Sequence, residues 1–378
     1  ERSNSFSGSV DWAFNLGHFS SNLLIEGFYT MLNDVFYLEE TGFDETTGTK
    51  IQERRNGHGA RVYGANIDYK IAHGKEAQLQ LGFTVQQSRY TEALELIKKE
   101  NPFPAVCGRI CNRRCEDACT RGNVDRAVAI DEIKKFVAEQ ELQADKRYIP
   151  KVITHRGIAD PYPEKIAVIG GGPSGLSAAY YLALMGHKVT VYEKRAKLGG
   201  MLRYGIPNYR LPREVLDAEI ASMLALGIDV HVNVNVGDDV TFDELRQQND
   251  ALYIALGAHT DKKTGIEGED ADGVISAVEM LREIGDDYMP DFRNKDIVVI
   301  GGGNVAMDVA RSSVRLGADK VAVAYRRRKA DMTALPEEVE SAMAEGVEIM
   351  ELYAPERIEA DEDGQVKALW VSQQMPGE

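Results

Sequence analysis

Residues 166–175 read IAVIGGGPSG, and this stretch decides the fold of the larger part of the chain. Four apolar residues at its start predict a short buried strand, and Gly170-x-Gly172-x-x-Gly175 follows without a break. Gly170 permits a tight turn, Gly172 lets backbone N–H groups approach a pyrophosphate, and Gly175 lets a helix pack closely on the strand. The stretch therefore predicts the start of a dinucleotide-binding unit, and a chance glycine-rich turn is the alternative.

The next residues complete a βαβ pattern. A helix is expected through about Met185, Gly186 ends it, and a second strand over residues 188–192 leads to Glu193. Glu193 lies at about the 20-residue spacing at which a carboxylate accepts hydrogen bonds from ribose hydroxyls. The positive end of the helix dipole adds to the attraction for phosphate. The candidate cofactor contacts of this unit are Gly170, Gly172, Pro173, Ser174, Gly175, Glu193 and Lys194.

A second glycine loop lies further along the chain. Residues 295–300 predict another strand, which leads into Gly301-x-Gly303-x-x-Ala306 and a helix through Arg315. Alanine at the third glycine position is tolerated by nucleotide-binding folds. The next strand is expected over residues 320–324. The candidate contacts here are Gly301, Gly303, Asn304, Val305 and Ala306.

The charges after each second strand distinguish the two cofactors. Glu193 would repel a 2′-phosphate, whereas Arg326 and Arg327, in an arginine triplet after the later strand, would bind one. The alternative for such a triplet is a solvated strand end. At this point of a nucleotide-binding fold, the contrast predicts FAD at the first loop and NADPH, rather than NADH, at the second.

Two nested dinucleotide units are typical of flavoprotein reductases, in which a second domain holds the nicotinamide against the flavin. Residues 250–257 predict the strand that ends the first FAD half, with Ala255 and Gly257 close to the cofactor. Hydride passes directly to the flavin in such enzymes, so no acid or base side chain is expected as a catalytic residue.

The four cysteines of the chain all fall between residues 107 and 119. Cys107, Cys111, Cys115 and Cys119 have the spacing C-x3-C-x3-C-x3-C, which suits thiolate ligation of a [4Fe–4S] cluster in a reducing compartment. Zinc, which usually shows paired C-x2–4-C knuckles, and four unligated thiols are the alternatives.

Three quoted stretches resemble one family of oxidoreductases. Residues 166–212, the motif GGGNVAMDVAR at 301–311 and the segment NPFPAVCGRICNRRCEDAC at 101–119 resemble the small subunit of NADPH-dependent glutamate synthase. Dihydropyrimidine dehydrogenase and NADPH–ferredoxin oxidoreductases are similar. The resemblance implies that electrons pass from NADPH through FAD and iron–sulfur centres to a partner subunit or a ferredoxin. It implies FAD contacts at Glu193, Gly200, Met201, Arg210 and Val236, and Arg203 is a further candidate for phosphate.

The sequence departs from that family in three places. An upstream cysteine group that shares ligation of two clusters is absent, so incomplete cluster assembly is expected, and the alternative for Cys107 is that it is not a ligand at all. Thr333 stands where some relatives have arginine. The chain stops at Glu378, before the family returns to its FAD domain, so weak FAD retention is expected.

Residues 1–90 have a different pattern. VYGANIDYKI at 62–71 and LQLGFTVQQSRY at 79–90 alternate apolar and polar residues, which predicts antiparallel strands with one apolar face. A short turn at residues 73–75 and a long polar connection at about 39–58 complete the pattern. Both an outer-membrane barrel and a soluble meander fit it. The stretches resemble late strands of a TonB-dependent outer-membrane receptor, which predicts a fusion of two unrelated pieces, natural or artefactual, and a fragment at the N-terminus.

Composition limits the remaining classes. A net charge of −16 over 378 residues excludes a basic nucleic-acid-binding surface. The chain contains no run of about 18 apolar residues, so a membrane-spanning helix is not expected, and no secretory leader is evident. We expect a cytoplasmic oxidoreductase part, with membrane association only through the N-terminal strands, whose parent would lie in the outer membrane.

The expected fold is α/β, with two nested Rossmann-like domains preceded by a helical cysteine-rich segment and an N-terminal antiparallel β segment. The predicted boundaries are 1–90 for the strands, 91–160 for the iron–sulfur-type segment, 161–290 for FAD and 291–378 for NAD(P). The leading function is an NADPH-dependent flavoprotein oxidoreductase, inert if truncation prevents cofactor assembly. The alternatives are a receptor-derived outer-membrane fragment and a non-catalytic dinucleotide-binding module.

Overall fold

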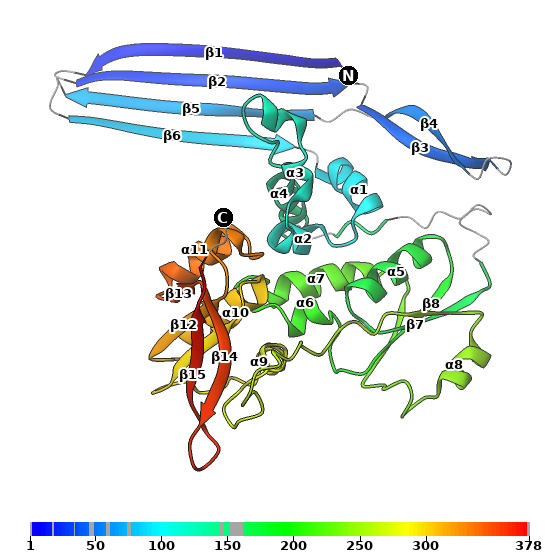
Figure 1. Ribbon diagram of the computed structural model, residues 1–378. Coiled ribbons are helices and arrows are strands. Elements are labelled where there is room, and N and C mark those ends of the chain that lie inside the picture. The colour runs from blue at the N-terminus through cyan, green and yellow to red at the C-terminus, as the bar shows by residue number, and fades with distance from the viewer. Residues whose placement is uncertain are drawn as a thin grey trace. The chain divides into compact units, whose positions relative to one another are not determined.

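The computed structural model describes residues 2–16, 19–33, 35–44, 49–57, 61–73, 77–88, 90–143, 147–150 and 162–375. The chain divides into two compact units, residues 1–99 and 100–378 (Figure 1). None of the helices in the described parts combines the length and the apolar character that crossing a bilayer requires.

The first unit contains an antiparallel sheet in the order β1-β2-β5-β6 (Figure 1). Val10 of β1 faces Ile25 of β2, which in turn faces Ile67 of β5. The neighbouring row joins Asp11, Leu24 and Asp68. Apolar rows therefore alternate with mostly polar rows, as the period-two pattern predicts. The strands are β1 (Arg2–Leu16), β2 (Phe19–Asn33), β5 (Arg61–His73) and β6 (Ala77–Ser88).

The prediction of a long loop at residues 39–58 is wrong. The structure forms a two-stranded hairpin there, β3 (Val35–Asp44) and β4 (Thr49–Gly57), with a register shift between Glu40 and Gly42. An antiparallel ladder is closed by backbone hydrogen bonds, so a polar stretch without apolar alternation can still pair. The turn at residues 74–76 lies outside the described residues.

Short helices come after the sheet, as the change of pattern near residue 91 predicts. They are α1 (Tyr90–Glu100), α2 (Pro104–Ile110), α3 (Arg114–Asp117), the 3₁₀ turn η1 (Thr120–Asn123) and α4 (Ile130–Gln143). Helices α2 and α4 pack closely at Gly108, where an added Cβ would lie 2.5 Å from Cβ of Lys135. Glycine is therefore required at this crossing, since no larger side chain fits between the two helices.

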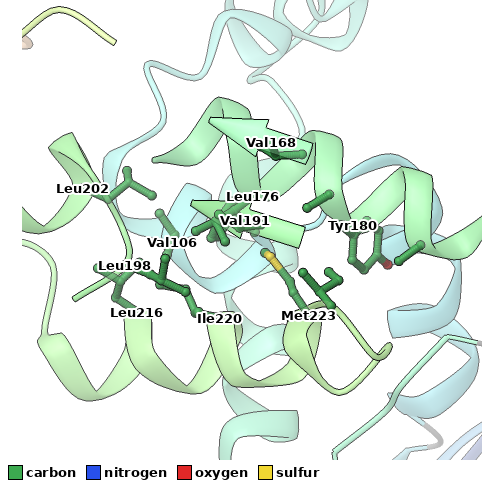
Figure 2. Close-up of a cluster of buried hydrophobic side chains, with 14 of the residues drawn as sticks. Val106, Val168, Leu176, Tyr180, Val191, Leu198, Leu202, Leu216, Ile220 and Met223 are labelled. Atoms are coloured by element: carbon green, nitrogen blue, oxygen red, sulfur yellow. The ribbon is translucent and has the colours of Figure 1, made fainter. Parts of the chain in front are cut away.

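The first dinucleotide domain is a parallel sheet in the order β10-β7-β8-β9 with helices packed against it (Figure 1). Its apolar core gathers Leu176 and Tyr180 of α5, Val191 of β8 and Met223 of α7 (Figure 2). Val106 of α2 lies in the same cluster, so the cysteine segment and this domain share a core. The elements are β7 (Lys165–Ile169), α5 (Pro173–Leu184), β8 (Lys188–Glu193), α6 (Met201–Tyr204), α7 (Arg213–Leu224), β9 (Asp229–Val232), α8 (Phe242–Gln248) and β10 (Ala251–Ile254).

The second dinucleotide domain has its own parallel sheet, β11-β12-β13, and its own core around Met307, Val323 and Ala342. A two-stranded antiparallel sheet, β14-β15, comes after it in the chain. The elements are α9 (Ala277–Gly285), β11 (Asp296–Ile300), α10 (Asn304–Arg315), β12 (Lys320–Tyr325), η2 (Lys329–Asp331), α11 (Pro336–Ala344), β13 (Glu348–Glu351), β14 (Tyr353–Ala360) and β15 (Val366–Gln373). Both predicted βαβ units are confirmed to within a few residues at their ends.

Candidate functional site

The first glycine loop connects β7 to α5 in close contact with its neighbours. Gly170 has φ 109°, and an added Cβ there would lie 2.3 Å from the carbonyl oxygen of Ala255. A Cβ on Gly175 would lie 1.9 Å from the carbonyl oxygen of Gly170. The close helix–strand packing expected of this motif is therefore present, and Ala255, just after β10, lies against the turn.

Glu193 at the end of β8 is buried beside the same loop. Its Oε2 accepts the backbone N–H of Gly171 at 2.8 Å, and Oε1 accepts the N–H of Arg195 at 2.9 Å. Helix α5 starts at Pro173 with no side-chain cap. Its first-turn N–H groups are therefore available as donors, next to a carboxylate placed for ribose hydroxyls. This donor and acceptor set fits the nucleotide part of FAD.

The segment around Gly200 lies directly on this loop. Gly200 has φ 49°, and a Cβ on it would lie 2.6 Å from Cα of Gly172. Arg203 is buried and donates from Nε to the carbonyl oxygen of Leu198 at 2.7 Å, and it also pairs with Asp217. The Arg203 guanidinium therefore stabilises the loop from inside, and the phosphate role considered for it stays a prediction.

The other first-site candidates lie around the same strand ends. The backbone N–H of Val234 donates to the carbonyl oxygen of Glu193 at 3.0 Å, so Val236, two residues on, is close to the end of β8. Ser174 Oγ lies 3.2 Å from the hydroxyl of Tyr253 in β10, a residue that the sequence did not single out. Lys194 is exposed, and Gly257 adopts φ 72° beyond β10.

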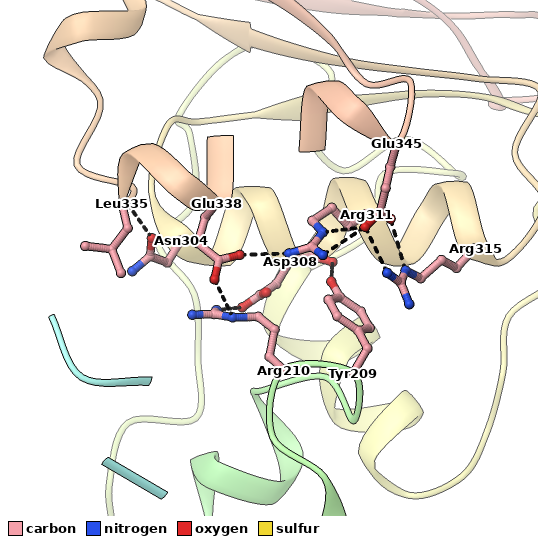
Figure 3. A network of polar contacts seen from close by, with 9 residues as sticks. All are labelled: Tyr209, Arg210, Asn304, Asp308, Arg311, Arg315, Leu335, Glu338 and Glu345. Atoms are coloured by element: carbon pink, nitrogen blue, oxygen red, sulfur yellow. Dashed lines mark hydrogen bonds and ion pairs between the residues drawn. The ribbon is translucent and has the colours of Figure 1, made fainter. Parts of the chain in front are cut away.

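The second glycine loop is covered by the segment before α11. The carbonyl oxygen of Gly302 accepts the N–H groups of Thr333 and Ala334, both at 3.1 Å. Asn304 Oδ1, at the start of α10, accepts the N–H of Leu335 at 2.9 Å (Figure 3). Helix α10 has no side-chain cap at Gly303. The predicted contacts from Gly301 to Ala306 thus form an uncapped helix start, as at the first loop.

Tyr325 occupies the position in the second unit that Glu193 occupies in the first. A Cβ on Gly302 would lie 2.6 Å from the Tyr325 ring, just as Gly171 contacts the Glu193 carboxylate. The Tyr325 hydroxyl donates to the carbonyl oxygen of Asp331 at 2.8 Å. Among the described residues, no carboxylate therefore takes the ribose position of the second unit. Counting residues from Gly301 finds Tyr325, but it does not show that the tyrosine ring contacts Gly302.

The three arginines after β12 differ in whether their side chains have a partner. Arg328 Nε lies 3.0 Å from Oδ2 of Asp331. Arg326 and Arg327 are exposed, and no hydrogen bond or ion pair of their side chains is found in the described parts of the chain. Arg326 and Arg327 are therefore the members of the triplet whose guanidinium groups remain available to a phosphate.

Arg210 lies between the two dinucleotide domains. Its Nη1 donates to Oδ2 of Asp308 at 2.7 Å, and its Nε lies 2.9 Å from Oε1 of Glu338 (Figure 3). Both carboxylates belong to the second domain, on α10 and α11. The neighbouring Tyr209 donates to the carbonyl oxygen of Asp308 at 3.3 Å, and burial raises the pKa of its phenol to about 12.

The cysteine segment places its thiols in different surroundings. Burial raises the pKa of the Cys107 thiol in α2, whereas backbone N–H groups, that of Val128 first, lower the pKa of the Cys119 thiol. Cys115 is exposed. Within the described residues, no three His, Cys, Asp or Glu side chains gather into a group that could hold a metal ion. This arrangement does not fit a complete [4Fe–4S] ligand set.

Comparison with known proteins decides the family. A model of the pyridine nucleotide-disulphide oxidoreductases matches residues 164–374. The chain belongs to this family. A second model, dihydropyrimidine dehydrogenase domain II with its 4Fe–4S cluster, matches residues 83–146. Together they confirm the prediction of a pyridine-nucleotide oxidoreductase preceded by an iron–sulfur-type segment.

Subunits of several known enzymes are similar to this oxidoreductase chain. The NADP(+)-dependent formate dehydrogenase subunit beta of Moorella thermoacetica is 41% identical over 303 residues, 75% of this chain and 43% of that protein. The NADPH-Fe(3+) oxidoreductase subunit beta of Geobacter sulfurreducens is 38% identical over 75% of this chain and 42% of that protein. The glutamate synthase [NADPH] small chain of Escherichia coli K12 is 35% identical over 75% and 61% respectively.

These matches cover only part of each relative and only part of this chain. The chain spans less than half the length of the first two relatives. The two family models match residues 83–146 and 164–374, so they give no support to the receptor resemblance of the N-terminal strands. The resemblance to the glutamate synthase small chain is confirmed as a similarity shared with other oxidoreductase subunits.

Proposed function

We propose that this chain is the NADPH-oxidising flavoprotein part of a multisubunit oxidoreductase, with FAD on the first glycine loop and NADPH on the second. The contrast between the two βαβ units carries the proposal. The first has the buried Glu193 carboxylate against Gly171, and the second has the Tyr325 ring against Gly302, followed by the exposed Arg326 and Arg327. A carboxylate suits ribose hydroxyls, whereas guanidinium groups suit a 2′-phosphate.

The proposed domains are the predicted ones, 91–160 for the cysteine segment, 161–290 for FAD and 291–378 for NAD(P), with one change. Helix α9 is assigned to the second domain, because its Met280 and Leu281 pack in that domain's core. Each loop offers uncapped helix N–H groups to a pyrophosphate. The proposed FAD contacts are Gly170, Gly172, Pro173, Ser174, Gly175, Glu193, Lys194, Gly200, Met201, Val236, Ala255 and Gly257. The proposed NADPH contacts are Gly301, Gly303, Asn304, Val305, Ala306, Arg326 and Arg327.

The flavin, when bound, supplies the hydride acceptor, and the protein supplies position and electrostatics. Glu193 orients the adenosine ribose, and Arg326 and Arg327 select the phosphorylated nucleotide. The small residues Ala255 and Gly257, after β10, let the backbone lie close to the flavin. Because the four thiols are not gathered, no electron step is assigned to a cluster. We propose a partner subunit as the acceptor, since the relatives are named as subunits. Reduced thiols favour a cytoplasmic location.

An anaerobic absorption spectrum of the purified chain, supplied with FAD and then with NADPH, tests the proposal. With FAD supplied in excess, we expect a flavin band at about 450 nm that bleaches with NADPH and much more slowly with NADH. A chain that retains flavin but shows no bleaching with either nucleotide would leave only a nucleotide-binding module. Equal rates with both nucleotides would contradict the assigned role of Arg326 and Arg327.

A further inference from the structure

The contact between Arg210 and the second domain is nearly closed to solvent. The side chains of Arg210 and Asp308 are only 9% and 4% exposed, and that of Glu338 is 14% exposed. Arg210 comes after α6 and belongs to the first domain, whereas its two carboxylate partners lie on α10 and α11 of the second. A charged side chain at low exposure is stable only with such partners.

The charges on the second domain do not balance without Arg210. Arg311 Nη1 lies 2.9 Å from Glu338 Oε2, and its Nη2 lies 2.8 Å from Glu345 Oε1, so Arg311 already serves two carboxylates of its own domain (Figure 3). Asp308 is left to Arg210, and its Oδ1 is buried without a hydrogen-bond partner in the described structure. Desolvation, opposed by Arg210, raises the Asp308 pKa to about 6. The second domain therefore depends on a cation from the first.

Arg210 also lies on a short path between the two glycine loops. On one side, Gly200 packs on Gly172 of the first loop, and Arg213 holds the segment between them by donating to the carbonyl oxygen of Ile206 at 2.8 Å. On the other side, Asp308 lies about one turn into α10, which starts directly at the second loop with Asn304. Arg210 is therefore connected through packed neighbours to both glycine loops.

A second contact between the domains lies at a different place. Gly285 at the end of α9 would place a Cβ 2.8 Å from Cα of Tyr204 in α6, and Arg195 pairs with Asp286 at 2.8 Å. One contact alone would leave the second domain free to rotate about it. Two separate contacts restrict that rotation.

We infer that Arg210 is a positioning residue whose bridge to Asp308 and Glu338 fixes the angle at which the second domain presents its nucleotide to the first. The inference rests on the proposed function for its effect on hydride transfer, but not for its effect on the domain contact. A guanidinium held by two carboxylates of the other domain is not available to an FAD phosphate, so this bridge takes the place of the FAD contact that the resemblance implies for Arg210.

The experiment compares the wild-type chain with Arg210→Gln, Arg210→Lys and the control Arg282→Gln, whose ion pair with Glu279 lies within α9. Three quantities are measured: the NADP⁺ dissociation constant, the rate of flavin bleaching at saturating NADPH, and amide hydrogen exchange in the cofactor-free chain. For Arg210→Gln we expect bleaching to slow by on the order of 10- to 100-fold, with NADP⁺ affinity changed less than about threefold. Exchange should rise in residues 206–211 and 305–311 while β7 and β11 stay protected.

The outcomes separate the inference from the proposed function. If NADPH does not bleach the flavin of the wild-type chain, the proposed function is contradicted. The inference about Arg210 is tested separately, because amide exchange that is unchanged in Arg210→Gln would overturn it even then. An NADP⁺ affinity that falls in parallel with the rate would make Arg210 a cofactor ligand instead. If Arg210→Gln does not fold, Arg210→Lys decides: lysine cannot bridge both carboxylates in the same geometry, so a lysine variant identical to wild type in exchange and rate also overturns the inference.

Discussion

The carboxylate of Glu219 in α7 accepts the backbone N–H of Ala105 in the first turn of α2 at 2.7 Å. Its other oxygen accepts the N–H of Val106 at 2.8 Å. A buried side chain of the first dinucleotide domain therefore caps the helix that carries Cys107, in place of a local capping residue. This contact attaches the cysteine segment to the domain proposed to hold FAD.

Replacing Glu219 with alanine is expected to lower the free energy of unfolding by about 2–3 kcal/mol, because two buried N–H groups lose a charged acceptor. Urea denaturation followed by circular dichroism measures it. Glu214→Ala, an exposed change on the same helix, is the control and should cost less than about 0.5 kcal/mol. Equal effects of the two changes would show that the cap does not stabilise the segment.

Gly175→Ala is expected to disrupt the first glycine loop. The new Cβ would lie 1.9 Å from the backbone oxygen of Gly170, which cannot move without displacing the turn. We expect a loss of about 3 kcal/mol or more in stability, together with loss of added FAD in equilibrium dialysis. Gly122→Ala is the matched control, since its nearest atom would be 3.7 Å away. Retained FAD in Gly175→Ala would argue against the assignment of this loop.

The double change Arg326→Gln and Arg327→Gln is expected to weaken NADPH binding by about 10- to 100-fold. This is the effect of losing at least one charge-assisted hydrogen bond to the 2′-phosphate. NADH binding, which lacks that phosphate, should not change. Arg328→Gln is the control because its side chain already pairs with Asp331, and it should change affinity less than about threefold. Titration of each variant with both nucleotides measures the difference.

Asp308 makes the stability of the folded chain depend on pH, and its burial determines the direction of that dependence. Desolvation, opposed by Arg210 and reinforced by Glu338, raises its pKa from 3.8 to about 6 in the folded chain. The folded state therefore binds the proton more tightly than the unfolded state, and this group's contribution to stability falls as pH rises from about 4 to about 6. The stability of wild type relative to Asp308→Asn should fall by on the order of 2–3 kcal/mol over that range. A relative stability that instead rises with pH would mean that the ion pair with Arg210 and the attraction of the nearby Arg311 outweigh burial.

The thiols of Cys107 and Cys119 should react at different rates in the metal-free chain. The lowered pKa of Cys119 gives more thiolate at about pH 8, and the raised pKa of the half-buried Cys107 gives less. Mass spectrometry after brief iodoacetamide treatment should find Cys119 labelled first. Labelling in urea is the control and should remove the difference, whereas equal rates in the folded chain would contradict the described surroundings.

Much of the fold can be predicted from local pattern. The apolar run before Gly170, the glycines themselves and the acid at Glu193 have roles within a single βαβ unit, so their spacing is enough to predict strands and helices. The same holds for the second unit around Gly301. The hairpin β3–β4 was missed because backbone pairing needs no apolar alternation, and the order of the sheets needs contacts that no local pattern contains.

The sequence by itself determined the two glycine loops, the cofactor contrast between Glu193 and the arginines after Tyr325, and the clustering of four cysteines, because each depends on residues close together in the chain. Only the tertiary structure decided that Arg203 is buried inside its loop, that Arg210 pairs with Asp308 and Glu338, and that Glu219 caps α2. Most of these partners are far apart in sequence. Burial and the pairing of charge depend on packing between domains, and a one-dimensional pattern does not specify which buried charge meets which.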